Sequence, residues 1–250
     1  DDYDFIRAHT DETPKLTIPS PTRVHVLGGD AAVDRTIYPD IEDFWSDLVA
    51  VYREEIAALE AAGCRYIQID DPYLANFVDA TQRERLKAVH GDLDRLLARY
   101  VDVLNRCMAK RLPGTHMALH VCRGNARSAW TASGGYEPIA EAALGGLEAD
   151  TLFLEFDDDR SGGFEPLRHV RPGVNVVLGL VTSKRPALED AETLKARIDE
   201  AAQFMPLDRL ALSPQCGFAS TTDGNLLTYS DQWNKLSLVV RVAKEVWTDA

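Results

Sequence analysis

Short apolar segments alternate with helical segments along the whole chain, and this pattern constrains the fold more than any other feature. The apolar segments are rich in Val, Ile and Leu and cover residues 15–18, 66–70, 115–121, 151–156, 174–180 and 209–213. Between and after them, apolar periodicity predicts helices at residues 40–62, 79–110, 136–145, 164–170, 188–204 and 230–246. Strands that alternate with helices pair in parallel, so we expect an α/β protein built from βαβ units.

Two architectures accommodate six such strands. One is an open, doubly wound sheet, and the other is a (β/α)8 TIM barrel, which has eight strands and normally needs about 250 residues. The strand ends favour the barrel, because barrel enzymes assemble their sites there and five polar residues occupy these positions: Asp70, His120, Glu155, Lys184 and Cys216. We therefore expect residues 1–250 to form a single barrel domain that is N-terminally incomplete, with its first two strands upstream or missing.

The charge and apolar pattern exclude several classes of function. Forty acidic residues against 27 basic ones give a net charge of −13, which argues against nucleic acids and anionic membrane surfaces as partners. No apolar run approaches the roughly 20 residues of a membrane span, and no signal peptide is visible. Four cysteines are too few for a disulfide scaffold, so we expect a soluble cytoplasmic protein in which cysteines are buried, catalytic or metal-binding.

Three strand ends carry residue types that bind metal ions. In His120-Val121-Cys122, strand alternation points the His and Cys side chains to the same side, while Cys216 follows another strand and Glu155 closes a third. Two thiolates, one imidazole and one carboxylate suit tetrahedral zinc. Each piece alone is also typical of a packed core pair, a small buried hydrophobe or a helix cap. Cys64 and Cys107 lie in apolar surroundings and are interpreted as structural.

The ordered combination of motifs resembles the cobalamin-independent methionine synthase family. His120-Val121-Cys122, Glu155 and Ser213-Pro214-Gln215-Cys216-Gly217 resemble its zinc site, and Gln68-Ile69-Asp70-Asp71-Pro72 resembles its substrate motif. The short, single-barrel members of the family are the most similar, through segments that start at Cys122, Ser133 and Arg160.

The resemblance implies a TIM barrel with a catalytic zinc at its C-terminal face, held by His120, Cys122, Glu155 and Cys216. It implies an S-methyltransferase that passes a methyl group from a methylated pterin of the 5-methyltetrahydrofolate type to homocysteine, giving methionine. Its partners are thus a small-molecule thiol and a methyl donor. Asp70 corresponds to the aspartate that binds the amino group of homocysteine, although it also suits a helix cap. Asp71 stands where the larger synthases carry Glu.

The chain departs from the larger synthases in two ways. Their N-terminal barrel is absent, and Lys184-Arg185-Pro186 replaces a His-Ser-Pro whose His is thought to pass a proton. Lys184 is therefore a candidate catalytic residue or anion contact, or else a solvated loop lysine. Arg123 and Arg127 are candidate anion contacts. With Arg160 and Arg185 these residues form a cationic set near the expected mouth, and ordinary salt bridges to residues 157–159 are the alternative explanation.

Other functions stay open from the sequence. A thiol alkyltransferase similar to epoxyalkane:coenzyme M transferase uses the same chemistry with a sulfonate substrate. A barrel similar to uroporphyrinogen decarboxylase, which needs no metal, and an inactive fragment or binding module are alternatives from other classes. The sequence does not determine the methyl donor or the oligomeric state.

Overall fold

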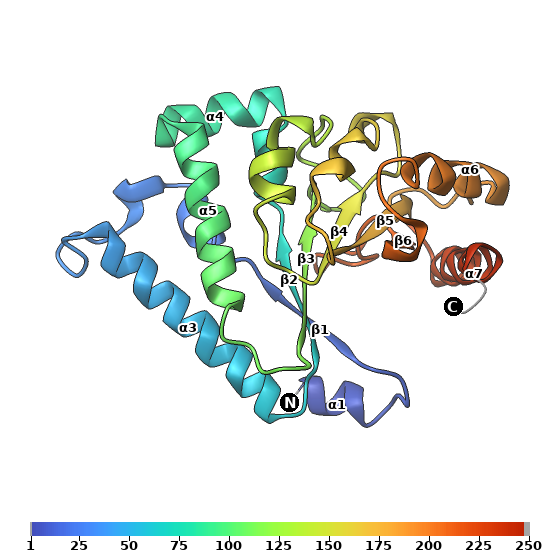
Figure 1. The fold of residues 1–250 in the computed structure, drawn as a ribbon, viewed down its shortest axis with the longest axis horizontal. Coiled ribbons are helices and arrows are strands. Elements are labelled where there is room, and N and C mark those ends of the chain that lie inside the picture. Colours follow the sequence, from blue (N-terminus) through green and yellow to red (C-terminus); the bar gives the residue numbers. More distant parts are fainter. Residues whose placement is uncertain (1, 248–250) are drawn as a thin grey trace.

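The computed structural model describes residues 2–247, and the strands of this part form one parallel six-stranded sheet (Figure 1). They are β1 (Lys15–Pro19), β2 (Tyr66–Asp71), β3 (His116–Val121), β4 (Thr151–Glu155), β5 (Asn175–Val181) and β6 (Leu210–Pro214). Each boundary lies within one residue of the prediction. The spatial order follows the sequence from β1 to β6, whereas a doubly wound sheet reverses its order at a switch point. The barrel-type arrangement is thus confirmed.

The sheet is open between its first and last strands. In the described part of the chain, β1 pairs with β2 alone and β6 pairs with β5 alone. Six consecutive strands of an eight-stranded barrel would leave such a gap. All six strands run in the same direction, so their C-terminal ends lie along one edge, where the site is built.

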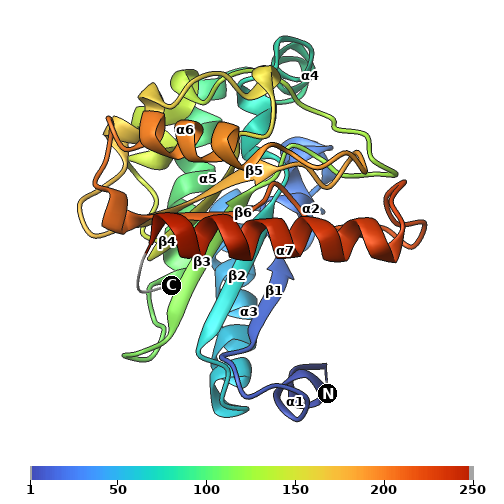
Figure 2. The same cartoon turned by 90° about the vertical axis from the view of Figure 1, so that its right-hand side faces the viewer.

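The helices are grouped at the two ends of the sheet. They are α1 (Asp2–Arg7), α2 (Arg23–Val26), α3 (Ile41–Ala61), α4 (Ala80–His90), α5 (Leu93–Met108), α6 (Ala191–Ala201) and α7 (Tyr229–Val246). Figure 1 shows α3 and α5 beside β1 to β3, and α6 and α7 beside β5 and β6. In Figure 2, α7 crosses in front of the strands, and it contacts β6. None of the described helices is long and apolar enough to span a membrane.

Two helix predictions need correction. The helix expected over residues 79–110 is two helices, because Gly91 adopts a positive φ of +73° and ends α4, while the Asp92 side chain caps α5. The helix expected at residues 136–145 is a 3-10 helix at Glu137–Ile139 followed by a π-helix at Ala140–Leu144. The short helix expected at residues 164–170 is present as a 3-10 helix at Glu165–His169. Pro138 and Pro166 stand in the first turn of two of them.

The apolar core packs the strands against the helices and thereby fixes the strand ends. The buried face of α5 contributes Leu97, Tyr100, Val103 and Leu104 to the core cluster. Fully burying a side chain of this size stabilises a fold by about 1.5–3 kcal/mol. Residues 64 and 107 are also part of this core, so their interpretation as structural cysteines agrees with their burial.

Candidate metal centre

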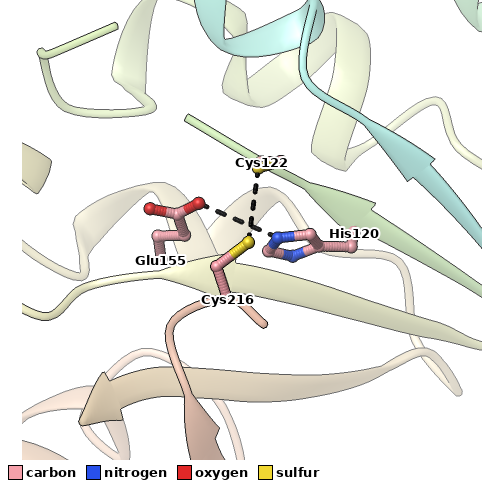
Figure 3. A group of neighbouring side chains, drawn as sticks. All are labelled: His120, Cys122, Glu155 and Cys216. Carbon is pink, nitrogen blue, oxygen red and sulfur yellow. Dashed lines mark hydrogen bonds and ion pairs between the residues drawn. The ribbon is translucent and has the colours of Figure 1, made fainter. Parts of the chain in front are cut away.

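Four side chains from three different regions of the sequence converge above the C-terminal ends of the strands. They are His120, Cys122, Glu155 and Cys216, and one ligand atom from each lies within 4.8 Å of the others. Figure 3 shows the imidazole, the carboxylate and the two sulfur atoms pointing toward a common centre. The structure thus brings together the four residues that the sequence singled out.

The spacing of these atoms fits one tetrahedral ion. The Sγ atoms of Cys122 and Cys216 are 3.6 Å apart, and Nε2 of His120 is 3.8 Å from Oε1 of Glu155. Two zinc–sulfur bonds of about 2.3 Å at the tetrahedral angle would separate the sulfur atoms by about 3.8 Å. The His120 Nε2 atom is also buried without a hydrogen-bond partner. A buried nitrogen of this kind is costly unless something binds it, and a metal ion would do so.

Strand β3 positions His120 and Cys122 at the candidate metal centre. His120 lies beside Asp70 in the register of β2 and β3, and Cys122 follows the last residue of β3. The other ring nitrogen of His120, Nδ1, lies 3.2 Å from the carbonyl oxygen of Phe153 on β4. A donor at Nδ1 orients the ring and leaves Nε2 as the metal-facing atom.

Glu155 ends β4 and is completely buried. Its Oε1 atom accepts a hydrogen bond of 2.8 Å from the backbone N–H of Arg123, and its Oε2 atom accepts one of 3.2 Å from the side chain of Gln215. The guanidinium of Arg160 lies 3.3 Å from Oε2. These donors hold the carboxylate in a fixed orientation, as expected for a metal ligand in a closed shell.

A glycine on β5 lets the loop after β6 approach the centre. Gly179 is the register partner of Glu155, and a Cβ atom there would lie only 2.8 Å from the Cα atom of Gln215. The absence of a side chain therefore permits the close approach that places Cys216 over the strand ends.

The electrostatics of the centre follow from three acidic groups around one imidazole. Burial favours the neutral form of His120, but Cys216, Asp70 and Glu155 outweigh burial and raise the pKa of His120 to about 9. Burial raises the pKa of Glu155. The hydrogen bond between the two thiols raises the pKa of Cys122 and lowers that of Cys216, so the pair favours one thiol and one thiolate. Binding of a divalent cation by such a cluster would release protons.

A cavity of about 460 Å³ opens beside the centre. Asp70, His120 and Cys216 line it together with Lys15 and Phe153. The side chain of Asp70 is 38% exposed, and its Oδ1 atom is a buried oxygen without a hydrogen-bond partner. Burial raises the pKa of Asp70, and His120 opposes this rise. Because Oδ1 of Asp70 also lies 3.8 Å from Nε2 of His120, the cavity presents a carboxylate directly beside a candidate metal site.

Asp71, next in sequence, has a different role. It is completely buried, and its Oδ2 atom accepts hydrogen bonds from the hydroxyl groups of Ser20 and Thr22. Its Oδ1 atom accepts hydrogen bonds of 2.8 Å from the backbone N–H groups of Tyr73 and Leu74. Asp71 thus ties the loop after β1 to the loop after β2.

The expected cationic set at the mouth is dispersed. Arg123 is completely buried, donates to the carbonyl oxygen of Gly134 and lies over the ring of Tyr136, so it packs the loop and does not face the cavity. Lys184 is 5% exposed, which corrects the alternative of a solvated lysine. Arg127 is exposed, with a positive φ of +48°.

The remaining two cations of this set form salt bridges, the alternative that the sequence left open. Arg160 lies 2.8 Å from a carboxylate oxygen of Asp157, and Arg185 lies 3.5 Å from one of Asp158.

Sequence reasoning missed the polar residues that support the ligands. Gln215 accepts hydrogen bonds from Ser183 while it donates to Glu155, and Asn125 donates to the hydroxyl of Ser220. The only available signal was their position beside Cys122 and Cys216, which does not specify a contact.

Comparison with known proteins agrees with this geometry. Residues 36–245 match the family model described as the catalytic domain of cobalamin-independent synthase. The chain is 48% identical over 248 residues to an uncharacterized protein, YxjH, of Bacillus subtilis, which covers 98% of this chain. The chain spans about 65% of the length of that relative.

Two solved structures share the fold. A putative vitamin-B12 independent methionine synthase from Listeria monocytogenes superposes with a TM-score of 0.75 at 32% identity, covering 98% of this chain and 69% of that one. A B12-independent methionine synthase from Shewanella sp. W3-18-1, in complex with selenomethionine, superposes with a TM-score of 0.72 at 22% identity, covering 99% of this chain and 66% of that one. The second match concerns the fold alone.

Proposed function

Because the chain belongs to the cobalamin-independent methionine synthase family, we propose that it takes part in zinc-dependent transfer of a methyl group to the thiol of homocysteine, giving methionine. A methylated pterin of the 5-methyltetrahydrofolate type is the proposed donor. The observation that carries the proposal is the convergence of His120, Cys122, Glu155 and Cys216 within 4.8 Å beside a cavity that also holds Asp70.

The donor set supports zinc as the metal. Two thiolates, one imidazole and one carboxylate form a set that suits zinc. When bound, zinc would lower the pKa of a substrate thiol and supply a thiolate at neutral pH. The same four residues argue against the metal-free alternative similar to uroporphyrinogen decarboxylase, because that chemistry gives no reason to gather two cysteines and a histidine around one point.

Asp70 supports an amino-acid substrate. Its carboxylate lines the cavity beside Cys216 and has an oxygen without a hydrogen-bond partner. An ammonium group of the substrate would form a charge-assisted hydrogen bond there. A thiol alkyltransferase similar to epoxyalkane:coenzyme M transferase is the second candidate, and Lys15 in the same cavity is the observation that favours a sulfonate. Coenzyme M has no amino group, so Asp70 favours homocysteine.

The proposed domain is a single barrel in which two further strands complete the sheet between β6 and β1. The unpaired edges of these strands within residues 2–247 support this arrangement. The exposed apolar side chains on α7, which include Trp233 and Val240, also support it because a neighbouring helix would cover them. The cytoplasm is the proposed location, since a reducing compartment keeps four free cysteines reduced.

Metal analysis combined with thiol titration tests the proposal. The purified protein should contain about one equivalent of zinc, and calorimetry should show that it binds homocysteine more tightly than coenzyme M. A protein that takes up no zinc would contradict the proposed chemistry. A preference for coenzyme M would favour the second candidate.

A further inference from the structure

Lys184 is buried in a place where a lysine is costly. It lies in the β5 loop (residues 182–190), is 5% exposed, and its Nζ atom donates to the carbonyl oxygen of Gly124 and to Oδ1 of Asn125, both at 3.0 Å. No carboxylate of the described residues forms a salt bridge with it within 4.0 Å. Removing an ammonium from water and pairing it only with neutral oxygens costs free energy. The contact therefore calls for a functional explanation.

The first hydrogen-bond partner of Lys184, Gly124, also contacts Cys122. Gly124 belongs to the β3 loop (residues 122–135), and its backbone N–H donates to the Sγ atom of Cys122 at 3.4 Å. The carbonyl oxygen of the same residue receives the hydrogen bond from Lys184. Gly124 has a φ of +90°, and a Cβ atom there would lie 2.5 Å from Oγ1 of Thr131, so the loop follows a tightly defined path. Lys184 thus fixes a residue that directly supports one thiol.

The second hydrogen-bond partner, Asn125, is connected to Cys216 through Ser220. Asn125 donates through Nδ2 to the carbonyl oxygen of Gly217 at 2.7 Å and to the hydroxyl of Ser220 at 2.8 Å, both in the β6 loop (residues 215–228). The Oγ atom of Ser220 lies 3.7 Å from the Sγ atom of Cys216. Because Lys184 engages Oδ1 of Asn125, it sets the orientation in which the amide group donates toward the β6 loop.

From these contacts we propose that Lys184 is a positioning residue, which ties the β3 loop to the β6 loop through Asn125 and so holds Cys122 and Cys216 at the spacing that one metal ion requires. This inference rests on the proposed function. It replaces the expected catalytic or anion-binding role of Lys184, because both polar contacts of the ammonium are made within the protein.

A second tie between the same loops should keep the variants folded. Asn225 of the β6 loop donates to the carbonyl oxygen of Ser183 at 2.7 Å and accepts from the backbone N–H of Ser128 at 3.1 Å. These contacts do not involve Lys184. Loss of its ammonium should therefore change the spacing of the two thiols without unfolding the barrel.

The test measures zinc affinity by competition with a chelator of known affinity. Lys184→Met removes the donor, Lys184→Arg retains a donor and a charge, and Asn125→Ala removes the bridge while leaving Lys184 in place. Arg185→Met is the matched control, because the neighbouring Arg185 is 65% exposed and its ion-pair partner is Asp158, which lies outside the β3 and β6 loops. Loss of residues that orient metal ligands typically lowers metal affinity about 10- to 100-fold.

We expect this loss for Lys184→Met and Asn125→Ala, a smaller loss for Lys184→Arg, and no change for Arg185→Met. The Lys184→Met/Asn125→Ala double variant should lose no more than the stronger single variant, because both act on one connection. Cobalt(II)-loaded Lys184→Met should also show altered visible absorption bands, which report ligand geometry at full metal occupancy. A mere loss of stability would leave those bands unchanged.

Several outcomes overturn the inference. Wild-type zinc affinity together with wild-type cobalt bands in Lys184→Met would do so, as would fully additive losses in the double variant. If Lys184→Met does not fold, unchanged affinity in Asn125→Ala overturns it instead. Failure of the wild-type protein to bind zinc is a different result, because it contradicts the proposed function itself.

Discussion

The Sγ atoms of Cys122 and Cys216 lie 3.6 Å apart although the two residues are 94 positions apart in the sequence. Neither residue lies inside a strand, yet each follows the end of one, so the packing of the sheet brings both to the same edge. The hydrophobic core cluster contains none of the four candidate ligands, although His120 and Glu155 lie near the ends of β3 and β4. Metal removal should then affect chemistry much more than folding.

Cys216→Ser tests this separation of site and core. A hydroxyl is a much poorer zinc donor than a thiolate at neutral pH, so the variant should lose most of its bound zinc. Because Cys216 lies on a loop above the strands, the circular dichroism spectrum should stay close to that of the wild type. Metal analysis and circular dichroism of the same sample check both statements. A variant that retains one equivalent of zinc would remove Cys216 from the ligand set, and one that unfolds would make the metal structural.

Asp70→Asn tests the amino-group contact. The substitution keeps the shape of the side chain but deletes the charge that would pair with an ammonium. A hydrogen bond to a charged group contributes about 1.5–3 kcal/mol, so homocysteine affinity should fall roughly 10- to 150-fold. Zinc content should stay the same, and 4-mercaptobutanoate, which lacks the amino group, should bind both proteins equally. Calorimetry with the two thiols decides the matter, and an unchanged homocysteine affinity would favour the coenzyme M-type alternative.

Asp71→Asn should instead act on stability. The completely buried carboxylate accepts four hydrogen bonds, from Ser20, Thr22, Tyr73 and Leu74. In the Asp71→Asn variant the amide NH2 group would replace one oxygen, and it would face two of these donors. We therefore expect the free energy of unfolding to fall by about 2–4 kcal/mol. Urea denaturation measures the loss, with Asp70→Asn as the matched control at the neighbouring position. Equal stabilities of the two variants would contradict the assigned roles.

Thiol labelling should distinguish the four cysteines. Cys64 and Cys107 are 0% and 1% exposed, and burial raises the pKa of Cys107 to about 12. At pH 8 the thiolate fraction of Cys107 is then roughly 1 in 10,000, so iodoacetamide should leave it unmodified in the native protein. Cys216 is partly exposed and should react first in the zinc-free protein, and zinc should slow the reaction. Peptide mass spectrometry, with a urea-denatured sample as the control, locates the label. Rapid modification of native Cys107 would contradict this burial.

The sequence predicted the strands better than the helices for a physical reason. Buried parallel strands are short apolar runs with clear ends, whereas helix length depends on single capping residues. Gly91 and Asp92 divide one long periodic segment into α4 and α5, and apolar periodicity alone does not reveal this division. Pro138 and Pro166 each stand in the first turn of a 3-10 helix that is only three or five residues long.

The candidate ligands were also accessible from the sequence, because strand ends meet at one edge of a parallel sheet. The direction in which a side chain points after a strand end could not be predicted from the sequence. Arg123 and Lys184 both follow strand ends, yet each donates to backbone carbonyl oxygens of a loop and is buried. Those contacts depend on loop paths, including the positive φ of Gly124, that no local pattern specifies.

X-ray absorption at the zinc edge tests the central claim most directly. The proposed ligands supply two sulfur atoms, from Cys122 and Cys216, and two lighter atoms, from His120 and Glu155. Zinc-loaded protein should therefore show about two sulfur neighbours without substrate and about three with saturating homocysteine, with one lighter ligand lost or lengthened. Glu155 should be the ligand that dissociates or whose bond lengthens, because its oxygen is the hardest donor on a borderline-soft ion held by two thiolates. A sulfur count that stays at two with homocysteine and with other small thiols would contradict thiol activation by this centre.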